Sequence, residues 1–177
     1  MYPIAGWYSH WRWRIGNGGL AYALGPNQGE ALWFFGNLVT VKAGTNDTGG
    51  SYTLTEFLNP PGFASPVHVH HAEDEAIYVL DGRAEFHCGE QVFAAGPGSF
   101  VLLPKDVPHW LQVTSDAPCR SLVLTNPAQF ERFVGEAGEP ALARELPPPG
   151  PPDMARAARA GERFRVETLG PPPTAQE

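Results

Sequence analysis

The side chains best suited to chemistry gather in the run 68–75, which reads His-Val-His-His-Ala-Glu-Asp-Glu. Because side chains alternate across a β-strand with a period of two, His68 and His70 are predicted to project from one face of a strand. Glu75 returns to that face if the chain turns briefly and resumes as a strand, and His109 supplies a third imidazole. Three imidazoles and one carboxylate predict a site for one divalent first-row transition metal, namely Fe, Mn, Ni, Co, Cu or Zn.

The alternative for any single histidine is a hydrogen bond to a backbone carbonyl, which satisfies most lone buried imidazoles. The set favours metal binding, because four of only six histidines lie at positions 68, 70, 71 and 109. His71 has the opposite strand parity and is predicted to face outward, with support of a ligand as the alternative. Glu73 and Asp74 are predicted to be solvated turn residues. His10 is a further candidate ligand, although its aromatic surroundings favour packing.

Bulk composition describes an ordinary folded protein and argues against several classes of partner. Of 177 residues, 42% are hydrophobic and 18% charged, and the 20 Gly and 19 Pro favour short strands joined by turns. The net charge of −7 argues against nucleic acid and anionic membranes as partners. No apolar run approaches the ~20 residues of a membrane span. No signal peptide is evident, and Cys88 and Cys119 are interpreted as two buried thiols of a cytoplasmic protein.

Short β-rich segments separated by turns fill the middle of the chain. They contain Val, Ile, Thr and aromatic residues and are bounded by Gly, Pro, Asn or Asp. Asp81-Gly82 is a strong hairpin signal, and Gly36 predicts a bulge or sharp bend. The predicted strands are 32–41, 51–57, 66–70, 76–80, 83–88, 91–95, 99–103, 109–114 and 120–125. Short strands at regular spacing, with no helix among them, predict an all-β jelly roll or closed barrel.

The composition divides the chain into three parts. Residues 1–30 are rich in Trp, Tyr and Gly and are predicted to form an N-terminal arm that packs on the barrel or on a partner subunit. Residues 31–126 are predicted to form the barrel. Residues 127–177 are predicted to form a C-terminal helical extension that contains a Pro-rich connector.

Two helices are expected in this extension. The first covers 128–134, where the apolar residues follow helical spacing. The second covers 154–160, with Asp153 as its N-cap and Gly161 as its end. Both are predicted to cover the outside of the barrel, and a lid over the barrel mouth is the alternative. Residues 171–177 are expected to be disordered.

Two segments resemble the sequence motifs of the cupin superfamily. The second motif departs from the family at Asp106, where Gly is usual, and at Val113, where Asn is usual; Asp enters a left-handed turn readily, and the Asn is not a ligand in the family pattern. The resemblance implies a cupin double-stranded β-helix (a jelly-roll barrel) in a single-domain cupin with short C-terminal helices. The motif positions that match are Gly62, His68, His70, Glu75 and Gly82 in the first motif, and Gly98, Pro104 and His109 in the second.

Within the superfamily, the chain resembles the small bacterial quercetin dioxygenase-like proteins. The similarity rests on the strand 34–40, the histidine and glutamate set, and Asn126-Pro127 followed by Phe-Glu-Arg-Phe at 130–133. The resemblance implies an enzyme that binds the 3-hydroxyl and 4-keto region of a flavonol at the metal, cleaves the heterocycle with dioxygen and releases carbon monoxide. Glu75 would then be both a metal ligand and the catalytic base. The resemblance also implies a homodimer. Strand parity turns Trp110 outward if His109 faces inward, so Trp110 and the aromatic N-terminal arm are the candidate interface elements.

Strand parity predicts an apolar cavity around the metal, which suits an aromatic or other hydrophobic small-molecule substrate. Three classes of function stay open. The first is a metal-dependent dioxygenase acting on an enolic or phenolic molecule, and the second is a metal-dependent isomerase, lyase or hydrolase that uses the metal as a Lewis acid. The third is a non-catalytic cupin that binds a small ligand or senses metal. The candidate lining residues are Phe57, Ile77, Val79, Phe100, Leu102, Leu111 and Val113.

Overall fold

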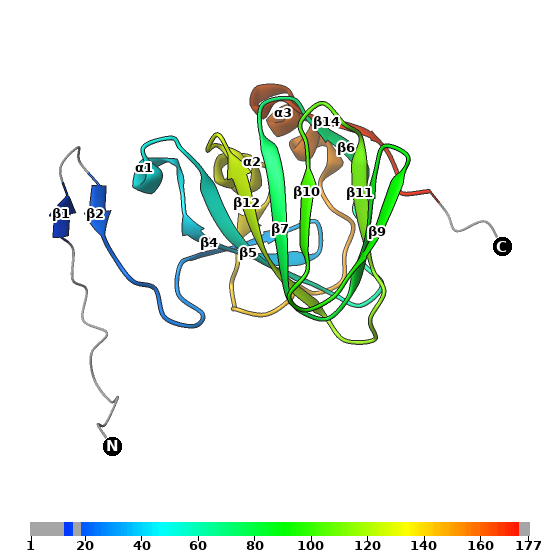
Figure 1. Cartoon of the computed structure of the whole chain (residues 1–177), viewed down its shortest axis with the longest axis horizontal. Helices are drawn as coiled ribbons and strands as arrows, with labels where there is room; N and C mark the ends of the chain where they lie inside the picture. Colours follow the sequence, from blue (N-terminus) through cyan, green and yellow to red (C-terminus); the bar gives the residue numbers. More distant parts are fainter. Residues whose placement is uncertain (1–12, 16–18, 174–177) are drawn as a thin grey trace, which may run out of the picture.

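Two antiparallel β-sheets facing each other form most of the molecule (Figure 1). The computed structural model describes residues 13–15 and 19–173, so His10 and the tail 174–177 lie outside the described residues. The larger sheet has the strand order β10-β7-β12-β5-β4-β3-β13. Its strands are β3 (Glu30–Phe34), β4 (Asn37–Ala43), β5 (Thr53–Asn59), β7 (Asp74–Asp81), β10 (Phe100–Leu103), β12 (Cys119–Asn126) and β13 (Glu139–Pro140).

The smaller sheet has the strand order β14-β6-β11-β8-β9. Its strands are β6 (Val67–His70), β8 (Ala84–Cys88), β9 (Gln91–Ala95), β11 (His109–Val113) and β14 (Val166–Gly170). A separate hairpin of β1 (Trp13–Ile15) and β2 (Gly19–Ala21) lies beside α1 (Thr45–Thr48), away from the facing sheets (Figure 1). The predicted all-β jelly roll is confirmed.

The core lies between the two sheets, where alternate residues of each strand point inward. Along β5, buried residues alternate with half-buried ones, and β12 alternates in the same way. This is the period of two that a strand with one buried face requires. Each large apolar side chain removed from water contributes about 1.5–3 kcal/mol, so the interleaved side chains hold the strands in register. The largest fully buried apolar side chains are Phe86, Ile77, Leu103, Val39, Val79 and Val134.

Two turns differ from the sequence prediction. The segment 32–41 is not one bent strand but the hairpin of β3 and β4, joined at Phe35 and Gly36, both with positive φ. No helix was predicted among the strands, but the connection 44–50 contains the short helix α1, whose capping box pairs the Gly44 N–H with the Asp47 carboxylate. Short polar helices of this kind satisfy their backbone hydrogen bonds locally. They bury no apolar face, so the sequence shows no hydrophobic periodicity that would predict them.

Helices α2 (Phe130–Ala137) and α3 (Met154–Phe164) pack against each other and against the core. Asp153 caps α3 as predicted, since its side chain accepts a hydrogen bond from the Arg156 N–H. The prediction that Gly161 ends this helix is wrong, because the helix continues to Phe164. A Cβ at Gly161 would collide with the Val166 carbonyl oxygen, so glycine here allows close packing.

The chain after α3 contributes a strand that the sequence did not predict. β14 pairs antiparallel with β6, with Val166 opposite His70 and Thr168 opposite His68. The short β13 likewise pairs with β3 and forms one edge of the larger sheet. The C-terminal segment therefore completes both sheets in addition to supplying helices. None of the helices among the described residues has both the length and the apolar character needed to cross a membrane.

Candidate metal centre

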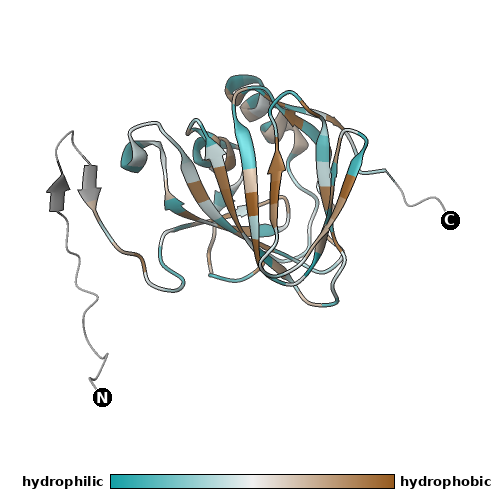
Figure 2. Cartoon of the chain, in the orientation of Figure 1, coloured by the Kyte–Doolittle hydropathy of each residue, from teal (hydrophilic) through white to brown (hydrophobic). Residues whose placement is uncertain are grey.

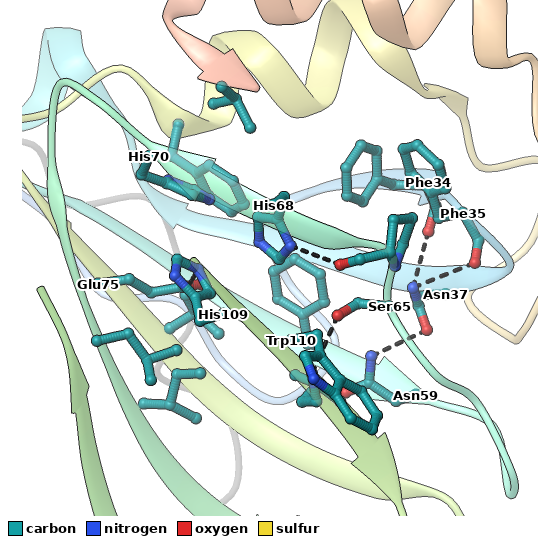
Figure 3. A pocket seen from close by; sticks show the side chains of 18 of the residues that line it. Phe34, Phe35, Asn37, Asn59, Ser65, His68, His70, Glu75, His109 and Trp110 are labelled. Carbon is teal, nitrogen blue, oxygen red and sulfur yellow. Dashed lines mark hydrogen bonds and ion pairs between the residues drawn. The ribbon is translucent and has the colours of Figure 1, made fainter. Parts of the chain in front are cut away.

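The four predicted ligands come from three strands, two in the smaller sheet and one in the larger sheet. His68 and His70 lie on β6, and His109 on the neighbouring β11 is the direct pairing partner of His68. After the turn 71–73, the chain enters β7 of the other sheet, whose second residue is Glu75. One potential ligand atom from each residue lies within 4.8 Å of the other three. Figure 3 shows the four side chains pointing toward one another.

Hydrogen bonds fix the orientation of all three imidazoles. Nδ1 of His68 lies 2.8 Å from the Pro66 carbonyl oxygen, and Nδ1 of His109 lies 2.9 Å from that of Val107. Nδ1 of His70 is paired instead with a carboxylate, that of Glu73. An Nδ1–H that donates to an oxygen leaves the lone pair of Nε2 free, which is the arrangement of metal-binding histidines.

The donor set fits a first-row metal ion. His109 Nε2 is buried and has no hydrogen-bond partner among the described residues; Glu75 Oε2, 3.4 Å away, lies at an ion-pair distance only. A buried polar atom without a partner is unfavourable unless something binds it. Neutral imidazole and carboxylate accept most divalent first-row ions, so the ligands fit this group without selecting one metal.

Electrostatics prepare two of these groups for binding a cation. Burial, reinforced by the neighbouring His109 and His70, lowers the pKa of His68 to about 3, so its imidazole is neutral at pH 7. Burial opposes ionisation of Glu75, but the neighbouring His109, His70 and His68 outweigh it and lower the pKa of this carboxyl to about 2. For His109, burial is outweighed by the Glu75 carboxylate, and its pKa is raised.

An aromatic cavity opens beside the four side chains (Figure 3). Of the residues predicted to line it, Phe57, Ile77 and Leu111 do so. The aromatic rings that the sequence analysis missed come from the β3–β4 turn, the β5–β6 loop, β11 and α2, which are far apart in the chain. These rings are Phe34, Phe35, Phe63, Trp110, Phe130 and Phe133.

The other four predicted lining residues lie elsewhere. Val79 and Val113 are buried in the core but do not line the cavity. Phe100 and Leu102 are 64% and 53% exposed on the outer face of the larger sheet. All four residues of β10 are apolar (Figure 2), so the sequence contains no alternation from which the inward pair could be chosen.

Three residues beside the ligands show how the turns support the site. Asp106 has a φ of 63°, the left-handed conformation expected where the family has glycine. His71 lies outside the cluster, with Nδ1 2.8 Å from Asp106 and Nε2 3.0 Å from Glu167. The prediction of a solvated Glu73 is wrong, because this side chain is only 1% exposed and contacts His70.

Comparison with known proteins agrees with this geometry. The family described as "Cupin domain" matches residues 55–125. Over 129 residues, the chain is 27% identical to quercetin 2,3-dioxygenase of Bacillus subtilis, a match that covers 73% of this chain and 38% of that protein. The chain thus spans well under half the length of this relative.

Two solved structures share the fold. A predicted oxalate decarboxylase of Thermotoga maritima superposes with a TM-score of 0.51 at 17% identity, covering 55% of this chain and 90% of that one. The cupin domain of Schizosaccharomyces pombe Cnp3 also has a TM-score of 0.51, at 13% identity, covering 63% of this chain and 72% of that one. These two structures share the fold alone, and the family match at residues 55–125, together with the facing sheets and the ligand strands, shows that the chain contains a cupin domain.

Proposed function

We propose that this protein is a metal-dependent dioxygenase that cleaves an enolic or phenolic small molecule of the flavonol type. The observation that carries the proposal is the position of the three histidines and Glu75 beside a cavity walled by aromatic rings. The similarity to a bacterial quercetin 2,3-dioxygenase supports the choice of dioxygen chemistry over Lewis-acid chemistry alone.

His68, His70, Glu75 and His109 would hold the ion, which when bound would supply the site for substrate oxygens and for dioxygen.

The chain's own residues would perform the remaining tasks. Phe57, Phe63 and Phe130 would bind and orient a planar ring system and exclude water from it. Glu75, ionised at neutral pH, would accept the acidic hydroxyl proton of the substrate at a carboxylate oxygen. The same carboxylate would also be a ligand, so it would have to loosen from the ion as it takes the proton. This dual role assigns Glu75 as the catalytic base.

The test combines metal analysis with oxygen consumption. The purified chain is expected to retain, or to take up on reconstitution, about one equivalent of Fe, Mn, Ni, Co or Cu, because four ligands define a single site. With a panel of flavonols it should then consume oxygen and release carbon monoxide. Retained metal without oxygen uptake on any flavonol would contradict the dioxygenase and leave Lewis-acid catalysis or ligand binding.

Two variants assign the residues. Glu75→Gln should lower turnover about 100-fold or more, the usual effect of losing a general base. His109→Ala should abolish stoichiometric metal binding. His87→Gln is the matched control for metal binding, because this histidine pairs with Glu85 outside the cluster. The homodimer and the cytoplasmic location stay predictions, and light scattering on the purified chain tests the first.

A further inference from the structure

Glu73 is a buried carboxylate in the three-residue turn between the ligand strands β6 and β7. Its side chain is 1% exposed, Oε1 lies 3.1 Å from Nδ1 of His70, and Oε2 is buried without a hydrogen-bond partner among the described residues. Burying a carboxylate is costly even when it is paired, and replacing such groups by apolar ones is often stabilising. A turn that only had to connect two strands would gain nothing from glutamate at this position.

The other two histidines show that a backbone carbonyl can serve as the partner of Nδ1 in place of a carboxylate. His68 and His109 each place Nδ1 against the backbone carbonyl of the residue two positions earlier, Pro66 and Val107. Only His70 among the three has an anionic partner at Nδ1. A carboxylate that accepts the Nδ1 hydrogen fixes the tautomer and increases the electron density on Nε2, the atom that faces the cluster. His70 also lies against Phe130, with ring centroids 5.4 Å apart, so one ring face meets an apolar wall.

We propose that Glu73 is a positioning residue of the metal centre: it holds the ring of His70 in place and strengthens His70 as a metal ligand. The inference rests on the metal site of the proposed function and not on its dioxygenase reaction. Glu73 itself does not touch the substrate cavity, since it is absent from the cavity lining among the described residues.

The experiment measures metal affinity directly, without turnover. Metal-free full-length chain is loaded with Co²⁺ or Zn²⁺ in competition with a chromogenic chelator, and the visible spectrum of bound Co²⁺ reports the ligand field. Glu73→Ala should weaken binding about 10- to 100-fold, the usual cost of losing a partner of a metal-binding histidine. It should also alter the Co²⁺ spectrum. Glu73→Gln keeps an acceptor for Nδ1–H without the charge, so its affinity should lie between those of Glu73→Ala and the wild type.

Asp74→Asn is the matched control, because Asp74 is the adjacent, exposed acid and accepts a hydrogen bond from the Lys105 N–H. It should keep the wild-type affinity and spectrum. Wild-type affinity and spectrum in Glu73→Ala would overturn the inference. Equal losses in Glu73→Gln and Glu73→Ala would overturn the part of it in which the hydrogen bond to Glu73 holds the ring of His70. A wild-type chain that binds metal but lacks oxygenase activity leaves the inference standing and removes only the dioxygenase. A wild-type chain that binds neither ion overturns both.

Discussion

Protons compete with a metal ion to different degrees at His68, Glu75 and His109. His68, with a pKa lowered to about 3, and Glu75, with a pKa lowered to about 2, are already in their metal-binding forms at neutral pH. His109 differs, because the carboxylate of Glu75 beside it raises its pKa and holds its proton to higher pH. A metal ion must displace that proton, so binding and proton release are coupled at this residue.

Metal affinity should therefore rise with pH. Below the pKa of His109 its imidazolium cannot bind the ion, and above that pKa the neutral ring is free to bind. Chelator competition with Zn²⁺ at several values from about pH 6 to pH 8, the range in which histidine titrates, should give progressively tighter binding. His87→Gln should keep the same slope. An affinity that does not change with pH would contradict the assignment of His109.

Among the elements, the β3–β4 turn contributes two rings to the cavity at a cost in backbone strain. Phe35 has a φ of 51°, which is unusual for a bulky side chain, and its ring lines the cavity with that of Phe34. The Asn37 amide donates to the carbonyls of Phe34 and Phe35, and Asn59 donates to the Asn37 side-chain oxygen. Two asparagines thus hold the turn, as Figure 3 shows.

Removing this support should destabilise the chain measurably. Asn37→Ala leaves the buried Asn59 amide without its acceptor and frees the strained turn, so the free energy of unfolding should fall by about 1–3 kcal/mol. Urea denaturation followed by fluorescence measures the loss. Asn46→Ala, at an exposed site on α1, should change the stability by less than about 0.5 kcal/mol. Equal effects of the two variants would show that the hydrogen bonds of Asn37 do not stabilise the β3–β4 turn.

The sequence predicted those elements whose residues carry a local pattern. The ligand strands were predictable because His68 and His70 share a parity and because Glu75 lies at motif spacing. β14 was not, because Val-Glu-Thr-Leu-Gly has little apolar content and is stabilised by pairing with a strand far away in sequence. Glu73 was misplaced for a similar reason: burial of a turn residue depends on what tertiary packing places above it, and residue type favours exposure.

At the scale of the whole molecule, α2 and α3 link the core to the cavity. Phe164 of α3 packs on Phe133 of α2, with ring centroids 6.5 Å apart, and Phe133 lines the cavity with Phe130. The helices therefore both cover the core and form part of the cavity wall. The alternative, that they act as a lid over the barrel mouth, stays a prediction.

Removing the Phe164 ring from the contact between the helices should lower the free energy of unfolding more than a substitution at an exposed side chain. Phe164→Ala removes a buried aromatic ring, so the free energy of unfolding should fall by about 3–5 kcal/mol. Leu142→Ala, at a side chain that is 89% exposed, is the control and should be nearly neutral. Thermal unfolding by circular dichroism compares the two. A drop below about 1 kcal/mol for Phe164→Ala would contradict tight packing of α3 on α2.

The pairing of β14 with β6 has a consequence for biosynthesis. The strand that carries His68 and His70 has β11 on one side, but its other neighbour lies about a hundred residues downstream, a long-range contact of the kind that slows folding. At roughly 5–20 residues per second of translation, the ribosome needs on the order of ten seconds to make the chain between them. During that interval the edge of β6 is an open template for other strands. The sheet around His68 and His70 can therefore be completed only after β14 has left the ribosome.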